Sequence, residues 1–215
     1  MTELRTLDHT VAGHSIRASI APAYAAQLTD LLANLAEQPQ LVFEGATVQF
    51  GWGPIFLESL EEGSDALMMR IPDYAGEATH ERTDDLTAAF ATEVAQRDAA
   101  DLGGLRLQEV LFWQDILLVR GWQDFSGHRL RRMISDVDRW SGWLVTSADH
   151  DYDLHFEESE IEHEAAWRVA QLRPELAQVW QFPAGVGVEI RDGQIDHILD
   201  LDDDEREVFY NRGDS

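Results

Sequence analysis

Apolar residues in the first half of the chain alternate between the two-residue period of strands and the longer period of amphipathic helices. Turn-forming and capping residues separate these segments. Pro22 suits the first turn of one helix, and Thr83 with two aspartates after it caps another. The predicted order is a strand or hairpin at 9–20, a helix from Pro22, strands at 41–50 and 66–71, and a helix from Thr83 that ends near Gly103.

The second half of the chain carries shorter apolar runs. Residues 110–113 and 116–119 are too short for helices and rich in β-forming residues, which predicts two central strands. A third strand is expected around residues 143–145, and the apolar spacing at 161–172 predicts a helix. Near the end, Asp192-Gly193 lies between two apolar runs and predicts a hairpin, because Asp-Gly readily adopts the positive φ angles of a two-residue turn.

Strands in pairs with helices between them predict an α+β fold with mixed, largely antiparallel sheets and a few packed helices. The strict alternation of a doubly wound sheet is missing. A chain of 215 residues suffices for one large domain or two smaller ones. The polar segment 123–128 suggests an α+β N-terminal subdomain, 1–125, and a smaller α+β C-terminal subdomain, 126–215, and one continuous unit fits the same pattern.

The chain is strongly acidic. Its 41 Asp and Glu residues face 16 basic residues, all of them arginine, which gives a net charge of −25. Binding to nucleic acid or to an anionic membrane relies on cations that neutralise phosphates, so neither is expected as a partner. A basic protein surface would be attracted instead. The charge is uneven: residues 149–207 carry 18 acidic and 4 basic residues, concentrated in the runs 149–164 and 200–207.

Three further features point to a cytoplasmic location. Cysteine is absent, so neither disulfides nor thiolate chemistry contribute. The first residues lack a charged segment followed by an apolar one, the pattern of a secretory signal. No stretch approaches the roughly 20 apolar residues of a membrane-spanning helix.

One segment matches part of a calcium-binding loop. Its carboxylates fall at the first, third, fifth and twelfth positions of such a loop: Asp149, Asp151, Asp153 and Glu160. The sixth position, which needs glycine, is Leu154, and a strand rather than a helix is expected before the loop. His155 and His163 add imidazoles nearby, but their spacing fits no helical metal motif. A solvated acidic segment is the favoured interpretation, and a carboxylate-rich metal-binding protein or hydrolase using 149–160 is the alternative.

No catalytic motif stands out. The chain has neither a Gly-x-Ser-x-Gly nucleophile elbow nor a glycine-rich phosphate loop, so we expect a protein that is not an enzyme and uses no cofactor. Of the seven tryptophans, most suit the core, and Trp140, beside Ser141 and Gly142, is the first choice for an exposed interface anchor. The expected partner-binding residues are Trp140, Asp149, Asp151, Asp153, Glu157, Glu158, Glu160, Asp202, Asp203 and Asp204.

Residues 140–145, Trp-Ser-Gly-Trp-Leu-Val, resemble the Ser-Gly-Trp strand of bacterial immunity proteins from polymorphic-toxin systems. Further short similarities, within about residues 70–200, lie at 71–74, 83–86, 173–176 and 182–185. The resemblance implies a cytoplasmic protein that binds and neutralises a cognate toxin without catalysis, and it supplies no catalytic residues. Together with the net charge, it predicts a basic, nuclease-type toxin as the partner.

Overall fold

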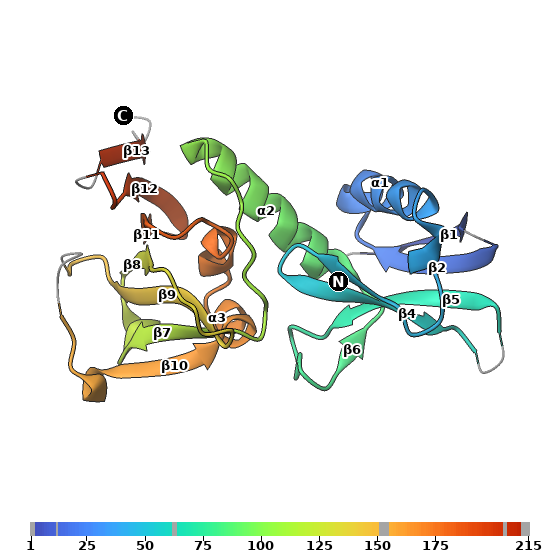
Figure 1. Cartoon of the computed structure of the whole chain (residues 1–215), viewed down its shortest axis with the longest axis horizontal. Helices are drawn as coiled ribbons and strands as arrows, with labels where there is room; N and C mark the ends of the chain where they lie inside the picture. Colours follow the sequence, from blue (N-terminus) through green and yellow to red (C-terminus); the bar gives the residue numbers. More distant parts are fainter. Residues whose placement is uncertain (1–2, 12, 62–63, 151–154, 204–205, 212–215) are drawn as a thin grey trace. The chain divides into compact units, whose positions relative to one another are not determined.

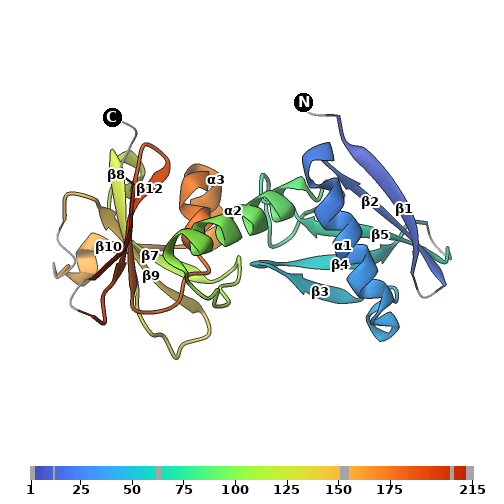
Figure 2. The ribbon, with the colours of Figure 1, turned by 90° about the horizontal axis from the view of Figure 1, so that it is seen from above.

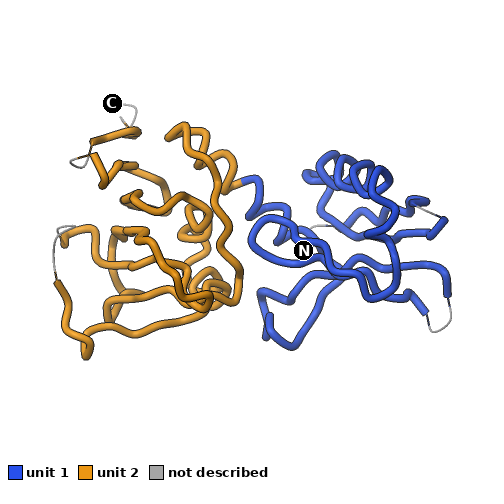
Figure 3. The backbone as a smooth tube through the Cα atoms, viewed as in Figure 1, with its two compact units in different colours: residues 1–94 blue, residues 95–215 orange. Residues whose placement is uncertain are grey.

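The computed structural model describes residues 3–11, 13–61, 64–150, 155–203 and 206–211 (Figure 1). Contacts along the chain define two compact units, Met1–Val94 and Ala95–Ser215, coloured separately in Figure 3. Each unit contains a mixed sheet and helical segments, which confirms the predicted α+β class. Within the described ranges, no helix combines the length and apolar composition needed to cross a membrane.

The first unit is built on a six-stranded sheet with the order β1-β2-β5-β4-β3, and β6 pairs with β5. Strands β2 and β5 run parallel, whereas the other neighbours are antiparallel. The elements are β1 (Arg5–Val11), β2 (His14–Ile20), η1 (Pro22–Tyr24), α1 (Ala25–Ala36), η2 (Pro39–Leu41), β3 (Thr47–Phe50), β4 (Gly53–Ser59), β5 (Ala66–Pro72) and β6 (Arg82–Thr83); α2 (Thr87–Gly103) follows.

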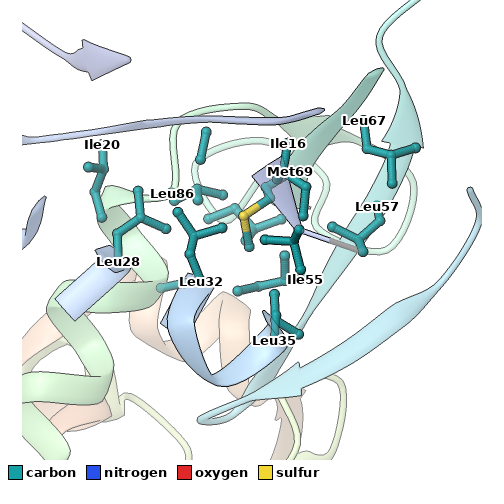
Figure 4. Close-up of a cluster of buried hydrophobic side chains, with 14 of the residues drawn as sticks. Ile16, Ile20, Leu28, Leu32, Leu35, Ile55, Leu57, Leu67, Met69 and Leu86 are labelled. Carbon is teal, nitrogen blue, oxygen red and sulfur yellow. The ribbon is translucent and has the colours of Figure 1, made fainter. Parts of the chain in front are cut away.

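Helix α1 packs across one face of this sheet (Figure 2). Leu28, Leu32 and Leu35 recur at the predicted helical spacing and are almost fully buried. Their side chains meet sheet residues such as Ile55 and Met69 (Figure 4). Each fully buried side chain of this type contributes about 1.5–3 kcal/mol relative to an exposed one, so this contact is a main source of stability for the unit.

Local predictions for the first unit hold at the turns but fail at one strand and at one helix start, since Thr83 belongs to β6 and α2 begins at Thr87. The predicted hairpin at 9–20 is β1 and β2, joined through Gly13, whose φ is +88°. Only the end of the expected strand 41–50 is extended, as β3. Strand β4 was missed because the sequence Gly-Trp-Gly-Pro at 51–54 predicts a turn over its first residues. The turn is tighter, since Phe50 already pairs with Gly53.

The second unit contains a seven-stranded sheet with the order β10-β7-β9-β8-β11-β12-β13. Strands β7 and β9 run parallel, and every other neighbouring pair is antiparallel. The elements after α2 are β7 (Asp115–Val119), η3 (Trp122–Asp124), β8 (Gly127–Arg132), β9 (Trp140–Ser147), η4 (Glu158–Glu160), β10 (Ile161–Ala165), α3 (Ala166–Leu172), η5 (Pro174–Val179), β11 (Val186–Arg191), β12 (Gln194–Asp200) and β13 (Arg206–Tyr210).

The domain boundary expected at 125/126 lies inside this second unit. It falls between β7 and β8, which are strands of one sheet and both pair with β9. The polar segment 123–128 is therefore a connection within a sheet. The division between the units lies in helix α2 instead, where the sequence shows no linker composition.

Two further predictions for this unit were wrong. The expected helix at 161–172 begins as the edge strand β10 and becomes helical only at Ala166, because pairing with β7 satisfies the backbone of the first five residues. The expected strand at 110–113 is an irregular segment that caps α3: the Trp167 amide donates to the Phe112 carbonyl at 2.9 Å. The predicted hairpin is confirmed as β11 and β12, with positive φ at Asp192 and Gly193.

The core of the second unit is centred on two tryptophans. Trp143 from β9 and Trp180, which follows η5, are fully buried, with ring centroids 6.0 Å apart. The indole nitrogen of Trp143 donates a hydrogen bond of 2.8 Å to the Trp180 carbonyl, which satisfies its buried N–H. This contact joins β9 to the segment that leads into β11, so the central strand is held on its core face.

The same core contains a buried titratable group, His128 on β8. Its Nε2 donates to the Trp122 carbonyl at 2.9 Å, and only 1% of the residue is exposed. Burial lowers the pKa of His128 below its usual 6.5, and this hydrogen bond opposes the shift only in part. The native state therefore holds neutral His128 at a pH where the unfolded chain has already taken up a proton.

We expect stability to fall as the pH drops below about 6.5, because the unfolded state then binds one more proton than the native state. The contribution of His128 to this loss is at most about 2 kcal/mol at pH 5. Replacing His128 with Gln should flatten the slope between pH 7.5 and 5, measured as urea-unfolding free energy. The carboxylates titrate in both proteins and cancel in the difference, so parallel curves would contradict this assignment.

Candidate partner-binding site

The structure separates the expected partner-binding residues between the two ends of the seven-stranded sheet. Trp140 is the first residue of β9, and Asp149 lies two residues beyond its last residue, Ser147. Because β9 is irregular near its start, Trp140 to Ser147 advances only as far as about five residues of the neighbouring strand β7, which is about 17 Å. Glu160 leads into β10, which runs antiparallel to β7 and begins at the same end as Asp149. The calcium-like segment and Trp140 therefore do not form one surface.

Around Asp149, the described carboxylates make contacts within the chain itself. The Asp149 carboxylate lies 4.0 Å from a guanidinium nitrogen of Arg191. Glu157 and Glu160 form a reciprocal capping box at η4, in which Glu160 accepts from the Glu157 amide at 2.8 Å. Glu158 is exposed. Three other expected partner-binding residues, Asp151, Asp153 and Asp204, lie outside the described residues.

At the other end of the sheet, residues 133–139 connect β8 to β9 and are here called the β8–β9 loop. Ile134 is 91% exposed and Val137 is 54% exposed, while Trp140 at the start of β9 is 43% exposed. Met133 is exposed as well. Large apolar side chains that cluster in solvent at one loop are characteristic of an interaction site. Trp140 thus has the exposure that the sequence predicted for an anchor.

Charged side chains, most of them carboxylates, flank these apolar side chains; Arg139, in the β8–β9 loop, is exposed as well and pairs with Asp115 at 2.6 Å. Asp136 and Asp138 alternate with the apolar residues in the β8–β9 loop and are exposed. Two expected residues, Asp202 and Asp203, follow β12 at the same end of the sheet and are also exposed, and Asp203 pairs there with Arg206 at 3.3 Å. From β9 to β12 there are three strand spacings, on the order of 14 Å. An apolar centre with an acidic rim is therefore formed within the dimensions of one protein interface.

Hydrogen bonds hold the β8–β9 loop in one conformation. The Met133 amide donates to the Gly142 carbonyl at 2.9 Å, and the Trp140 amide donates to the Val137 carbonyl at 2.9 Å. From the neighbouring segment, the Gln114 side chain donates to the Asp138 carbonyl at 2.7 Å. A loop with this many fixed points loses little conformational entropy when a partner binds.

The loop ends in an irregularity of β9. Trp140 pairs with Asp115 and Leu144 pairs with Leu117, so β9 takes four residue steps where β7 takes two. Gly142 lies in this bulge with φ of +85°, a value that side chains disfavour. A Cβ atom there would lie 2.2 Å from the Met133 carbonyl oxygen. Bulges of this kind redirect neighbouring side chains, and this one places Trp140 at the sheet end.

Arg132, the last residue of β8, holds the backbone next to the β8–β9 loop through hydrogen bonds. It is only 7% exposed, and its guanidinium donates to the carbonyls of Ser141 (3.2 Å), Glu109 (3.2 Å), Gln108 (3.4 Å) and Phe182. Burial lowers the pKa of Arg132 to about 10, so the group stays charged at neutral pH. Three backbone segments, at 108–109, Ser141 and Phe182, are therefore joined to the end of β8 through one side chain.

One cluster has the composition of a metal site. Ligand atoms of Glu189, Asp196 and His197 lie within 4.8 Å of one another. Arg129 pairs with Glu189, and Arg191 contacts both Glu189 (3.4 Å) and Asp196 (3.7 Å). These two guanidinium groups already neutralise the carboxylates and would repel a metal cation. The arrangement fits an ion-pair network across β8, β11 and β12 better than a metal centre.

Comparisons with known proteins found no matching family model, no similar curated protein and no similar solved structure.

Sequence reasoning found Trp140 but missed the loop before it. No role was predicted for Ile134, Asp136, Val137 and Asp138, which precede the strand expected around residues 143–145. The sequence did carry one indication of a loop: directly after three closely spaced arginines, apolar and acidic residues alternate in a way that fits neither a predicted strand nor a predicted helix. To predict that these residues are exposed, one must know where β8 ends, and the sequence pattern did not reveal this strand.

Proposed function

We propose that this chain is an immunity-type protein that binds a basic bacterial toxin and neutralises it. The observation that carries the proposal is the exposed apolar cluster of Met133, Ile134, Val137 and Trp140 with carboxylates around it. Protein interfaces commonly combine an apolar centre, often with tryptophan, and a polar rim. The acidic rim selects a basic partner, of which a nuclease-type toxin is the proposed example.

The net charge supports the same partner. A charge of −25 attracts a cationic protein over distances longer than direct contact and raises the rate of encounter. The acidic residues at the far end of the sheet, such as Asp149 and Glu158, contribute to this attraction without touching the partner. We therefore assign them to steering and assign Trp140 and the β8–β9 loop to contact.

The test is co-expression of this chain with each protein encoded next to its gene that proves toxic to a bacterial host. Wild-type protein should restore growth and form a one-to-one complex, whose association rate falls as salt rises. Trp140→Ala should weaken that complex about 30-fold or more, because truncating a buried interface tryptophan typically costs about 2 kcal/mol or more. Complex formation can be measured by calorimetry or surface plasmon resonance on the purified proteins.

The matched control is Tyr210→Ala. Tyr210 is 47% exposed and lies in the same unit, at the opposite end of the sheet from Trp140. We expect its replacement to leave the affinity unchanged. Equal loss in both variants would place contact outside the β8–β9 loop, and an absence of rescue and complex would contradict the proposal.

The alternative function, metal binding or hydrolysis by residues 149–160, makes a different prediction. A metal bound only by the native state raises its melting temperature. Because Glu157 and Glu160 already cap η4, we expect calcium and zinc to leave the melting temperature unchanged. A reproducible rise would favour the alternative.

A further inference from the structure

We infer that the cavity beneath the β8–β9 loop receives an arginine or lysine side chain of the partner. This inference rests on the proposed function and adds the chemistry of its central contact. The cavity measures about 260 Å³ and lies in the second unit. Its walls come from the β8–β9 loop, the start of β9 and the segment 108–114, so it opens beside Trp140.

Most polar groups around the cavity are already used by the protein. The Gln108 side-chain oxygen accepts from the Ala184 amide at 3.1 Å, and both ends of the Gln114 amide are bonded. The Ser141 hydroxyl donates to the Asp115 carbonyl at 2.8 Å. Arg132 donates to four carbonyls. These groups fix the walls and have little capacity left for a ligand.

Three carboxylates are different. Glu109, Asp136 and Asp138 line the cavity, and among the described residues their side chains form no hydrogen bond or ion pair. A carboxylate is an acceptor only, so its ligand must be a donor. With the one guanidinium of Arg132, the ionised groups of the lining sum to a charge of −2. A cationic donor is therefore the complementary occupant.

The apolar part of the lining suits the stem of a long basic side chain. Met133, Val137 and Trp140 contribute to the same cavity as the carboxylates. Arginine and lysine bury an aliphatic stem while their charged head stays with polar groups. A guanidinium also stacks favourably on tryptophan, and Trp140 is exposed enough to offer its ring. The basic partner would thus insert one side chain at the centre of the interface.

The inference can be tested without the toxin. The full-length chain, labelled with ¹⁵N, is titrated with N-acetyl-arginine amide at constant ionic strength. We expect saturable shifts in the millimolar range at the Trp140 indole N–H and the Gly142 amide. N-acetyl-citrulline amide has nearly the same shape but no charge, and it should bind at least fivefold more weakly because a neutral urea gains less from three carboxylates.

Two double variants separate a cavity from a general charge effect. Asp136→Asn with Asp138→Asn should abolish the shifts, whereas Asp149→Asn with Glu158→Gln removes the same charge at the other sheet end and should preserve them. The inference would be overturned if the citrulline derivative bound as tightly as the arginine derivative, or if both double variants lost arginine binding equally. Chemical-shift changes located away from Trp140 would overturn it as well. This outcome is independent of toxin rescue. If the Asp136→Asn, Asp138→Asn variant still rescues growth, only the cavity inference is rejected. If the wild-type protein binds the arginine derivative but fails to rescue growth, only the toxin partner is rejected.

Discussion

Replacing Gly142 with alanine is expected to destabilise the second unit by about 3 kcal/mol or more and to abolish the partner binding proposed above. The new Cβ would lie 2.2 Å from the Met133 carbonyl oxygen, a backbone atom that cannot rotate away. The left-handed backbone at φ of +85° adds about 1–2 kcal/mol for any side chain. Relief requires the β8–β9 loop to move, which displaces Trp140. Urea unfolding measures the loss of stability, and calorimetry or surface plasmon resonance with the partner measures the loss of binding.

Gly121→Ala provides a matched control in the same unit. Gly121 has φ of +83°, nearly the value at Gly142, but no atom lies within 4 Å of the position of its Cβ. Its replacement should therefore cost only the conformational part, about 1–2 kcal/mol, and leave binding intact. If the two variants lose the same stability, the close approach to Met133 is not what constrains Gly142.

Arg132→Met is expected to cost about 3 kcal/mol or more. Methionine fills much of the volume but supplies no donor, so the carbonyls of Ser141, Glu109, Gln108 and Phe182 lose the hydrogen bonds that Arg132 gives them. Each buried acceptor left without a partner costs about 1–3 kcal/mol. Arg132→Lys should recover little, because an ammonium has three donors and lacks the planar geometry of guanidinium.

The control for Arg132 is Arg106→Met, which removes the same charge from an exposed position of the same unit. We expect it to change stability by less than about 0.5 kcal/mol. Because removing a positive charge from this acidic chain raises the overall repulsion in both variants, the difference between them reports the buried hydrogen bonds. A similar loss in both would mean that general charge, not the carbonyl network, explains the effect.

The sequence predicted elements well where local chemistry decides them. Asp192-Gly193 forms a hairpin turn as expected, and Gly13 lies in the turn of the first hairpin; both turns use positive φ angles that glycine and Asp-Gly readily adopt. Predictions from the sequence failed where pairing with a strand distant in the sequence determines the secondary structure. Residues 161–165 have a helical pattern, yet they form β10 because the edge of β7 is available. Strand β8, rich in arginine, has no apolar pattern and is defined by its neighbours β9 and β11.

The same distinction applies to the site. The sequence favoured Trp140, beside Ser141 and Gly142, as an exposed tryptophan, and the residue is 43% exposed. The acidic runs around Asp149 and Asp202 were treated as one surface because they carry the same charge. Strand direction places them at opposite ends of the sheet, and no sequence pattern reports direction. The cavity beside Trp140 depends on segments brought together by the β7–β9 crossover, so it was not foreseeable.

The position of β9 also sets the order in which the second unit can assemble during synthesis. Strands β7 and β8 are consecutive in the chain, yet β9 lies between them, and every sheet partner of β7 and β8 comes later in the sequence. Nascent β7 and β8 therefore leave the ribosome without a partner until residues 140–147 emerge. A translational pause before β9 should lengthen the exposure of these strands to chaperones and proteases, whereas the described strands of the first unit find all their partners before residue 94.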